Sequence, residues 1–441
     1  MSGSPNQPLT SPLVEPRNVP IKTLRVSILP GSPDEITPPA REGDVLTVGT
    51  APGNDVVVQD RTVSGYHLEL IAKDSGILVI DLGSTNGTYA HQVSISKAIV
   101  RPETILKIGR SQLRVSQGAQ GQAVLTELTG NFGLIGASQS MERLYAQVEK
   151  VAGAPVGTHL HGETGTGKEL VARALHQLSD RKDQPFVTVD CGSVSPNLIA
   201  SELFGHEKGS FTGATGQRIG AFERADGGFL FLDEVGELPP SLQPQLLGVL
   251  ERGRFLRVGG TKEVSVDVRI VSATHRDLRR EVNDGSFRLD LYYRLAQVVL
   301  ELPPLRDRSE DIPVLLQHFL RECGHAGPIA EVISEQTLQE LQAHRWPGNV
   351  RELRNWVEAT IALGEIRDIP GPDTMRAMDP HSDEILMAPY KEARAHVLRD
   401  FEERYLARLL RENEGNVSAA AREARMDRTY LIKLLARHQL R

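Results

Sequence analysis

The sequence contains little cysteine and no long apolar run. Cys191 and Cys323 are the only cysteines among 441 residues. Two cysteines so far apart make neither a zinc site nor a disulfide framework, and scarce cysteine is typical of a reducing compartment. No stretch has the length and hydrophobicity of a membrane span, and the N-terminus lacks the pattern of a secretory signal. We therefore expect a cytoplasmic protein with no membrane partner.

Acidic residues outnumber basic ones over the whole chain but not at its end. The formal net charge is −7 at pH 7, which argues against a surface that binds nucleic acid throughout. From Ala393 to Arg441, however, there are eleven Lys and Arg residues and seven Asp and Glu residues. A short basic end on an acidic body is typical of a tethered DNA-binding module. The length allows about two to four domains with separate cores.

A glycine-rich turn lies near the middle of the chain, between an apolar run and a helical pattern. It comprises Gly162, Glu163, Thr164, Gly165, Thr166, Gly167, Lys168 and Glu169. The glycines let successive backbone N–H groups turn toward an anion, the next helix adds its dipole, and Lys168 can reach the β- and γ-phosphates of a nucleotide. The same spacing also occurs by chance, and Glu169 stands where Ser or Thr commonly binds magnesium.

An apolar strand pattern that ends in two carboxylates follows further along, at Gly228–Glu234. We expect Asp233 to hold Mg²⁺ through its water shell and Glu234 to polarise an attacking water. A solvated turn after a core strand is the alternative. Because both motifs occur in the right order with an αβ unit between them, the sequence predicts an α/β domain that binds ATP and Mg²⁺.

Between these motifs lies a flexible loop with a single aromatic residue. Phe211 has no periodic apolar neighbours within the segment Glu202–Ala214, and burial in the core is the alternative for it. The segment resembles the GAFTGA loop of bacterial enhancer-binding proteins, the AAA+ ATPases that activate sigma-54 RNA polymerase, with Ser210 in place of Ala. The resemblance implies that Phe211 and Thr212 contact sigma-54.

The same resemblance covers the surrounding domain almost continuously. It implies a P-loop ATPase over residues 132–366 whose last part is a small α-helical lid. In this family, residues at the positions of Arg288 and Arg294 reach the nucleotide of a neighbouring subunit, so hydrolysis is expected to need a homo-oligomer, from a dimer to a hexameric ring. Arg351 is expected to sense the γ-phosphate within its own subunit.

Two further positions depart from the family pattern. His275 follows an apolar strand at the place of the sensor I residue, which is usually Asn, and we expect it to hydrogen-bond the attacking water or the γ-phosphate. Asp190 stands where an Asn often restrains the glutamate of the acidic pair. These departures keep one alternative open, a DNA-binding scaffold or repressor with a weakened ATPase. A second alternative keeps the ATPase and is an AAA+ remodeller of another target.

Residues 1–20 are expected to form a disordered tail, and residues 21–117 show the alternating pattern of an all-β sandwich. Two loops place hydroxyl, amide and imidazole groups at strand ends, Thr62–His67 and Asp81–Thr88. Turn chemistry is the alternative for either loop alone. Together, the loops and strands resemble the forkhead-associated (FHA) domain, a reader of phosphothreonine peptides.

The FHA resemblance assigns roles to four side chains. Ser64 would bind the phosphate, His67 would support its loop, and Thr85 and Asn86 would hold the peptide backbone. The arginines common in this family are missing, with Arg61 as a substitute from the same loop, so a structural or protein-docking sandwich is the alternative. The expected partner is a threonine-phosphorylated protein or a Ser/Thr kinase.

Residues 118–131 are interpreted as a connector and residues 367–392 as a linker. The remaining residues, 393–441, show short helical patterns whose spacing resembles the Fis-type helix-turn-helix, in which the last helix enters the major groove. A solvated basic helix is the alternative. The residues expected to contact enhancer DNA are Arg428, Thr429, Tyr430, Lys433 and Arg437.

Together these resemblances predict a multidomain sigma-54-dependent transcriptional activator. It would have an N-terminal all-β FHA sandwich, a central α/β AAA+ P-loop ATPase with a helical lid, and a C-terminal all-α helix-turn-helix. Bound to enhancer DNA, it would hydrolyse ATP in a ring and remodel the closed complex of RNA polymerase, under the control of the phosphothreonine reader.

Overall fold

The computed structural model describes residues 17–29, 41–73, 75–119, 121–125, 133–193, 196–211, 214–325 and 327–363. Farther along, it describes Leu406, Asn413, Val417, Ala421, Met426, Leu431 and Leu435. The chain separates into two compact units, Met1–Arg367 and Asp368–Arg441. Within the described ranges, no helix is both long enough and apolar enough to cross a membrane.

Two sheets form the N-terminal sandwich of the first unit, as the alternating pattern predicts. Their strand orders are β10-β7-β6-β4-β5 and β3-β2-β12-β11-β8-β9. The strands are β2 (Leu24–Ile28), β3 (Arg41–Gly43), β4 (Val45–Gly49), β5 (Val56–Val57), β6 (Leu68–Lys73), β7 (Gly76–Asp81), β8 (Thr88–Ala90), β9 (Val93–Ile95), β10 (Lys97–Val100), β11 (Thr104–Ile108) and β12 (Ser111–Gln117). In β12, Leu113 and Val115 are buried in the core between the sheets, while Gln112 and Arg114 are exposed.

A further pair of strands departs from the sequence-based boundaries. β1 (Arg17–Ile21) pairs antiparallel with β13 (Gly121–Leu125) in a two-stranded sheet of its own. The expected disordered tail therefore ends in a strand, and the expected connector contains one. Each strand pairs with a partner far away in the sequence, so local composition gives little sign of either.

A five-stranded parallel sheet lies at the centre of the predicted ATPase domain, within the first unit, in the order β15-β16-β19-β14-β20. Its strands are β14 (Thr158–His161), β15 (Phe186–Asp190), β16 (Phe229–Asp233), β19 (Arg269–Thr274) and β20 (Val298–Glu301). Along β16, Phe229 and Phe231 belong to one apolar core, and Leu230 and Leu232 to another. Both faces of the sheet are therefore covered, which explains why this strand is almost continuously apolar in sequence.

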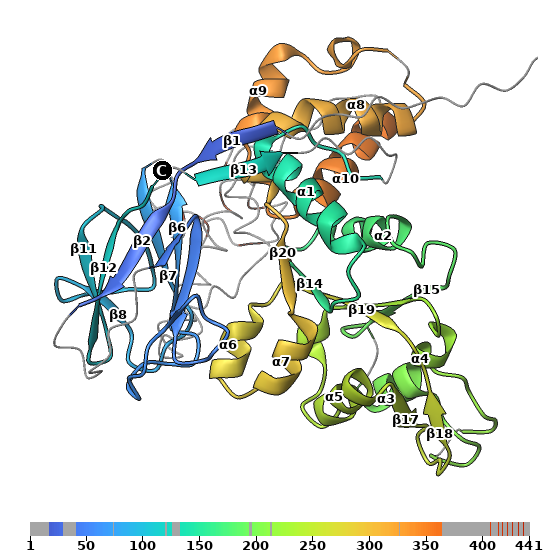
Figure 1. Ribbon diagram of the computed structural model, residues 1–441. Helices are drawn as coiled ribbons and strands as arrows, with labels where there is room; N and C mark the ends of the chain where they lie inside the picture. The colour runs from blue at the N-terminus through green and yellow to red at the C-terminus, as the bar shows by residue number, and fades with distance from the viewer. Residues whose placement is uncertain are drawn as a thin grey trace, which may run out of the picture. The chain divides into compact units, whose positions relative to one another are not determined.

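Helices on the two faces complete a three-layer α/β/α domain (Figure 1). α1 (Gln139–Ala152) and α2 (Lys168–Gln177) pack on the face of Phe229 and Phe231. The opposite face carries α3 (Pro196–Phe204), α4 (Ala221–Arg224), α5 (Gln243–Arg252), α6 (Leu278–Asn283) and α7 (Leu289–Leu295). A 3₁₀ turn, η1 (Val235–Glu237), follows β16, and a hairpin of β17 (Arg254–Leu256) and β18 (Glu263–Ser265) follows α5.

A smaller helical lid follows β20. It consists of η2 (Leu305–Asp307), η3 (Ser309–Asp311), α8 (Ile312–Glu322), η4 (Ile329–Glu331), α9 (Glu335–Ala343) and α10 (Asn349–Leu363). Trp346 is fully buried, and its indole N–H donates to the carbonyl oxygen of Leu341 at 2.8 Å. This hydrogen bond anchors the turn between α9 and α10, so the first residues of α10 have a fixed position.

The second unit is described at only a few residues. Leu406, Val417, Ala421, Leu431 and Leu435 are helical and share one apolar cluster. The residues expected to contact DNA, from Arg428 to Arg437, lie outside the described residues, so the helix-turn-helix stays a prediction.

Candidate nucleotide-binding site

The glycine-rich turn joins β14 to α2 and contains two glycines at positive φ. Gly165 has φ +79°, and Gly167, which directly precedes α2, has φ +105°. Glycine adopts these conformations without the steric cost that a Cβ brings. At Gly165 a Cβ would also lie 2.3 Å from the carbonyl oxygen of Gly348. The turn thus has the tight backbone and the helix N-terminus that bind phosphate groups.

Lys168 lies in the first turn of α2 and is only 8% exposed. Its ammonium group donates to the carbonyl oxygen of Gly162 at 2.8 Å and lies 3.8 Å from Oε1 of Glu234. Burial lowers the pKa of Lys168, while the charges of Glu234 and Asp233 oppose that shift. The lysine therefore lies between the glycine-rich turn and the acidic pair. Glu169, by contrast, forms an ion pair with Arg173 one helical turn further on, at 2.7 Å.

Asp233 and Glu234 lie at the carboxyl end of β16, at the sheet edge where the glycine-rich turn follows β14. Burial, and then the charge of Glu234, raises the pKa of Asp233. Burial also tends to raise the pKa of Glu234, but hydrogen bonds from His275 and the charge of Lys168 outweigh it and lower this pKa. Adjacent carboxylates whose pKa values are pushed apart are typical of a site where the two perform different tasks.

Glu234, which has a positive φ of 49°, is oriented by residues at the end of the neighbouring strand β19. Its Oε2 accepts hydrogen bonds from the hydroxyl of Thr274 at 3.0 Å and from the backbone N–H of His275 at 3.2 Å, and it lies 2.8 Å from Nδ1 of His275. Asp190 instead accepts a hydrogen bond from the N–H of Gly192 at 2.9 Å. An ionised carboxylate can only accept hydrogen bonds. Thr274 and His275 donate to Glu234 and thereby orient its carboxylate.

Sequence reasoning assigned His275 a role toward the attacking water or the γ-phosphate and overlooked the part of Thr274 in holding Glu234. The threonine reads as one more residue of a β-branched strand pattern, and β19 is fully buried. Its position as the last residue of that strand is the available signal, because the carboxyl ends of parallel strands meet at one edge.

Asn349 is a second residue that sequence reasoning missed. It is fully buried and has φ +53°. Its Oδ1 accepts a hydrogen bond from the N–H of Leu305 at 2.8 Å, and its Nδ2 donates to Oε2 of Glu163 at 3.1 Å and to the carbonyl oxygen of Thr164 at 3.0 Å. Arg306 forms a two-pronged ion pair with the same Glu163 at 2.7 and 2.8 Å. The lid is therefore tied to two of the predicted nucleotide-binding residues.

Arg351 approaches the glycine-rich turn from the lid of the same subunit. The N–H groups of Val350 and Arg351 lie 3.1 and 3.3 Å from the carbonyl oxygen of Gly165, and both donate to it. Burial lowers the pKa of Lys168, and the charge of Arg351 lowers it further. This placement suits a residue that detects a phosphate next to the lysine.

Arg288, the N-cap of α7, and Arg294, in its last turn, are both exposed and bind groups of their own subunit. The guanidinium of Arg288 forms an ion pair with Asp290 at 2.7 Å. The guanidinium of Arg294 donates to the carbonyl oxygen of Leu250 at 2.9 and 3.1 Å. The hydrogen bonds found among the described residues do not connect either arginine to the glycine-rich turn or the acidic pair. The predicted action on a neighbouring subunit's nucleotide thus stays a prediction.

Phe211 is 37% exposed on its loop, so burial in the core, the alternative for this residue, is wrong. Its ring packs edge-on against the ring of His206, with centroids 5.0 Å apart. Its carbonyl oxygen accepts a hydrogen bond from the N–H of Ala214 at 3.0 Å, which closes the loop tip. Thr212 lies outside the described residues.

The four side chains predicted to read a peptide gather at one edge of the sandwich. The hydroxyl oxygen of Ser64 accepts a hydrogen bond from the N–H of Thr85 at 2.9 Å. Nδ1 of His67 accepts one from the N–H of Ser64 at 3.1 Å, and Nε2 donates to the carbonyl oxygen of Gly87 at 3.2 Å. Burial lowers the pKa of His67, which favours this neutral form. Thr85 and Asn86 are exposed, so both can meet a ligand.

Comparison with known families accounts for both described domains. Residues 134–301 match the Sigma-54 interaction domain, residues 306–379 the AAA+ ATPase lid domain, and residues 46–109 the FHA domain. Transcriptional regulatory protein GlrR of Escherichia coli (strain K12) is 41% identical over 308 residues, which cover 70% of this chain and 68% of GlrR. The chain belongs to the family of sigma-54-dependent transcriptional activators.

Other relatives of this chain match the same region. DNA-binding transcriptional regulator NtrC of Azospirillum brasilense is 48% identical over 244 residues, which cover 55% of this chain and 50% of NtrC. The chain thus spans about half the length of such relatives. The crystal structure of NtrX from Brucella abortus in complex with ATP has 39% sequence identity and a TM-score of 0.51, over 70% of this chain and 69% of NtrX. The lid match ends at residue 379, beyond the expected boundary at 366.

Proposed function

We propose that the AAA+ domain of this sigma-54 activator hydrolyses ATP, and that hydrolysis within an oligomeric ring remodels the closed complex of sigma-54 RNA polymerase. The observation that carries this proposal is the arrangement of Lys168, Asp233 and Glu234. The three side chains meet at one edge of the parallel sheet, beside a glycine-rich turn on which the lid rests. This edge is where open α/β sheets bind nucleotides.

The residues present fit Mg-ATP, which supplies the phosphoanhydride bond to be cleaved. Lys168 would exchange the carbonyl oxygen of Gly162 for phosphate oxygens, and Asp233 would hold Mg²⁺ through water. Among the described residues, no three His, Cys, Asp or Glu side chains are arranged to hold a metal ion by themselves. A site that shares the ion with phosphates and water is therefore the arrangement that suits this chain.

Glu234 would orient and polarise the attacking water. Its lowered pKa keeps it ionised, and its contacts with Thr274 and His275 fix the direction of its carboxylate. Arg288 and Arg294 of one subunit would neutralise charge that develops on the γ-phosphoryl group bound to the next. To do so, they would have to leave Asp290 and the carbonyl oxygen of Leu250.

The other assignments concern partners. The loop that carries Phe211 and Thr212 would press on sigma-54, and the exposed ring of Phe211 supports this role. The edge formed by Ser64, Thr85 and Asn86 would recognise a phosphothreonine partner. The C-terminal segment would bind enhancer DNA, as its basic composition indicates.

Open-complex formation on a sigma-54 promoter, measured in vitro with ATP, tests the proposal. We expect the wild-type protein to support it and Lys168→Ala to abolish both ATP turnover and open complexes. Thr212→Ala should retain turnover and lose open complexes. A wild-type turnover no faster than that of Lys168→Ala would reject the ATPase and favour a DNA-binding scaffold. Open complexes formed normally by Thr212→Ala would reject the loop assignment and favour another remodelling target.

A further inference from the structure

Within the first unit, the end of α6 is inserted against the FHA sandwich. The side-chain amide of Asn283 donates to the carbonyl oxygens of Tyr66 at 2.5 Å and Leu82 at 3.1 Å, and its Oδ1 accepts from the N–H of Tyr66 at 3.2 Å. One residue of the ATPase domain thus satisfies three backbone groups of the FHA domain. This is a directional contact rather than simple apolar packing.

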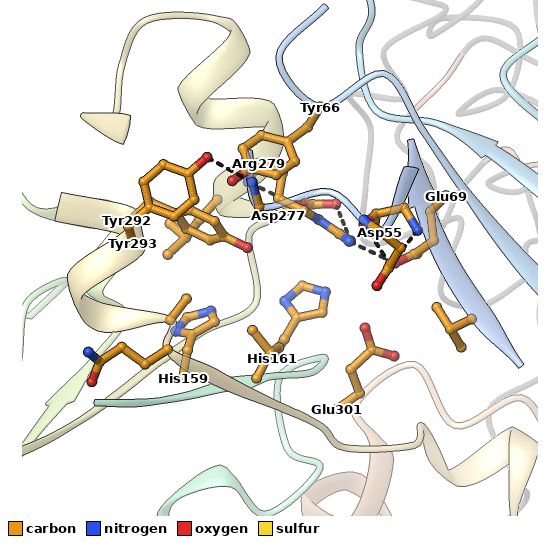
Figure 2. A pocket seen from close by; sticks show the side chains of 17 residues that line it. Asp55, Tyr66, Glu69, His159, His161, Asp277, Arg279, Tyr292, Tyr293 and Glu301 are labelled. Atoms are coloured by element: carbon orange, nitrogen blue, oxygen red, sulfur yellow. Dashed lines mark hydrogen bonds and ion pairs between the residues drawn. The ribbon is translucent and has the colours of Figure 1, made fainter. Parts of the chain in front are cut away.

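A buried ion network adds charge to the same contact. Nη1 of Arg279 lies 2.7 Å from Oε1 of Glu69 on β6, and its Nε lies 3.0 Å from Oδ1 of Asp277, the N-cap of α6. The Arg279 and Glu69 side chains are only 14% and 8% exposed. Figure 2 shows these residues on the wall of a cavity of about 590 Å³ lined by both domains. A polar, imperfectly filled boundary is typical of domain contacts that can separate.

Aromatic residues complete the contact on α7. The rings of Tyr66 and Tyr292 pack edge-on with centroids 5.4 Å apart. The N–H of Gly53 donates to the hydroxyl of Tyr293 at 3.1 Å, and a Cβ at Gly53 would lie 2.6 Å from the Tyr293 ring. Tyr293 directly precedes Arg294, so the FHA domain contacts the helix whose Arg294 is predicted to reach a neighbouring subunit's nucleotide.

The position of this contact on the FHA domain matters equally. Tyr66 lies two residues after Ser64, and Leu82 lies three residues before Thr85. The segments that α6 holds by their backbone are therefore the segments that carry the predicted phosphopeptide-binding residues. Glu69 occupies a strand position where an acidic side chain is ordinarily exposed, and its burial is explained by its partner on α6.

We propose that this FHA face is a docking surface for α6–α7 of its own chain, and that docking restrains the helix carrying Arg288 and Arg294 from engaging a neighbouring subunit. The docking surface comprises Gly53, Tyr66, Glu69, Leu82 and Asp81, whose carbonyl oxygen accepts a hydrogen bond from the guanidinium of Arg280 at 2.8 Å. The restraint rests on the proposed ring ATPase, whereas the docking itself does not. The FHA domain and a neighbouring subunit would then both contact α7.

Amide hydrogen exchange of the full-length chain tests the docking without reference to activity. Asn283→Ala removes three hydrogen bonds to the FHA domain and none that we find within the described ATPase domain. We expect exchange in the peptide containing Tyr66 to rise about fivefold or more. The matched control is Ser286→Ala, because the hydroxyl of Ser286 donates to Glu281 of its own domain and Ser286 lies in the same turn region. Unchanged exchange at Tyr66 in Asn283→Ala would overturn the docking.

The concentration dependence of ATP turnover tests the restraint. Asn283→Ala and Glu69→Gln should reach half-maximal specific turnover at a protein concentration about threefold or more below that of wild type, and Ser286→Ala should match wild type. Faster exchange at Tyr66 with an unchanged concentration dependence would overturn the restraint. If no variant hydrolyses ATP, the proposed function fails, while the exchange result still decides the docking.

Discussion

Substitution of Asn349 tests whether the lid is held to the glycine-rich turn as the structure shows. Asn349→Ala leaves the buried N–H of Leu305 without a partner, which costs about 1–3 kcal/mol. Alanine at φ +53° adds about 1–2 kcal/mol. A combined loss of about 2–5 kcal/mol should lower the Tm of the ATPase domain by at least about 4 °C. The lost bonds to Glu163 and Thr164 should also weaken ADP binding, by about tenfold.

Differential scanning calorimetry and ADP titration measure the two effects. Asn349→Gly is the matched variant, because it loses the same hydrogen bonds but adopts positive φ without steric cost. We expect it to weaken ADP binding as much as Asn349→Ala while losing less Tm. An Asn349→Ala protein with wild-type Tm and wild-type ADP affinity would refute the inferred lid attachment.

Three further predictions concern the two domains. Burial lowers the folded-state pKa of His67, so the contribution of His67 to stability is complete above its ordinary pKa of 6.5 and is lost as pH falls below that value. The Tm of the FHA domain should therefore drop below pH 6.5, and His67→Asn should remove this pH dependence. His275→Ala should lower ATP turnover by about tenfold or more with ADP affinity unchanged, because Glu234 loses an orienting contact; equal turnover would show that Thr274 suffices. Mixing Lys168→Ala with Arg294→Ala subunits should restore turnover above that of either variant alone, and failure to do so would argue against an arginine supplied in trans.

The sequence predicts the parts of this molecule whose signals are local. The glycine-rich turn, the acidic pair and the alternating strands of the sandwich can each be recognised within a few residues, because backbone conformation and burial impose their pattern directly. In the structure, the ammonium group of Lys168 lies 3.8 Å from Oε1 of Glu234, so the two motifs meet at one site. Comparison with relatives supports the family assignment on the same segments.

Contacts between segments far apart in the chain were not predictable in this way. Asn349 looks like an ordinary turn residue until Glu163, far away in sequence, is seen to bind it. Asn283 and Glu69 belong to different domains, and nothing in the periodicity of either segment reveals a partner. Residues 17–20 are assigned to the disordered tail by sequence for the same reason, since the strand that pairs with β1 begins at Gly121. Fold class can be predicted from local sequence patterns, whereas long-range polar contacts are recognised only in the three-dimensional structure.

The FHA contact lies close along the chain to Thr274 and His275, the residues that orient Glu234. Thr274 ends β19 and holds Glu234, and the segment then runs through His275 and Arg276 to Asp277, which caps α6 and pairs with Arg279. Arg276 is itself fixed by Glu237 of the turn after β16, at 2.6 Å. Because this short segment is anchored at both ends, a shift of α6 on release from the FHA domain would be transmitted to the residues that orient Glu234. Docking would therefore act on a subunit's own Glu234 carboxylate as well as on the arginines that are predicted to reach the next subunit.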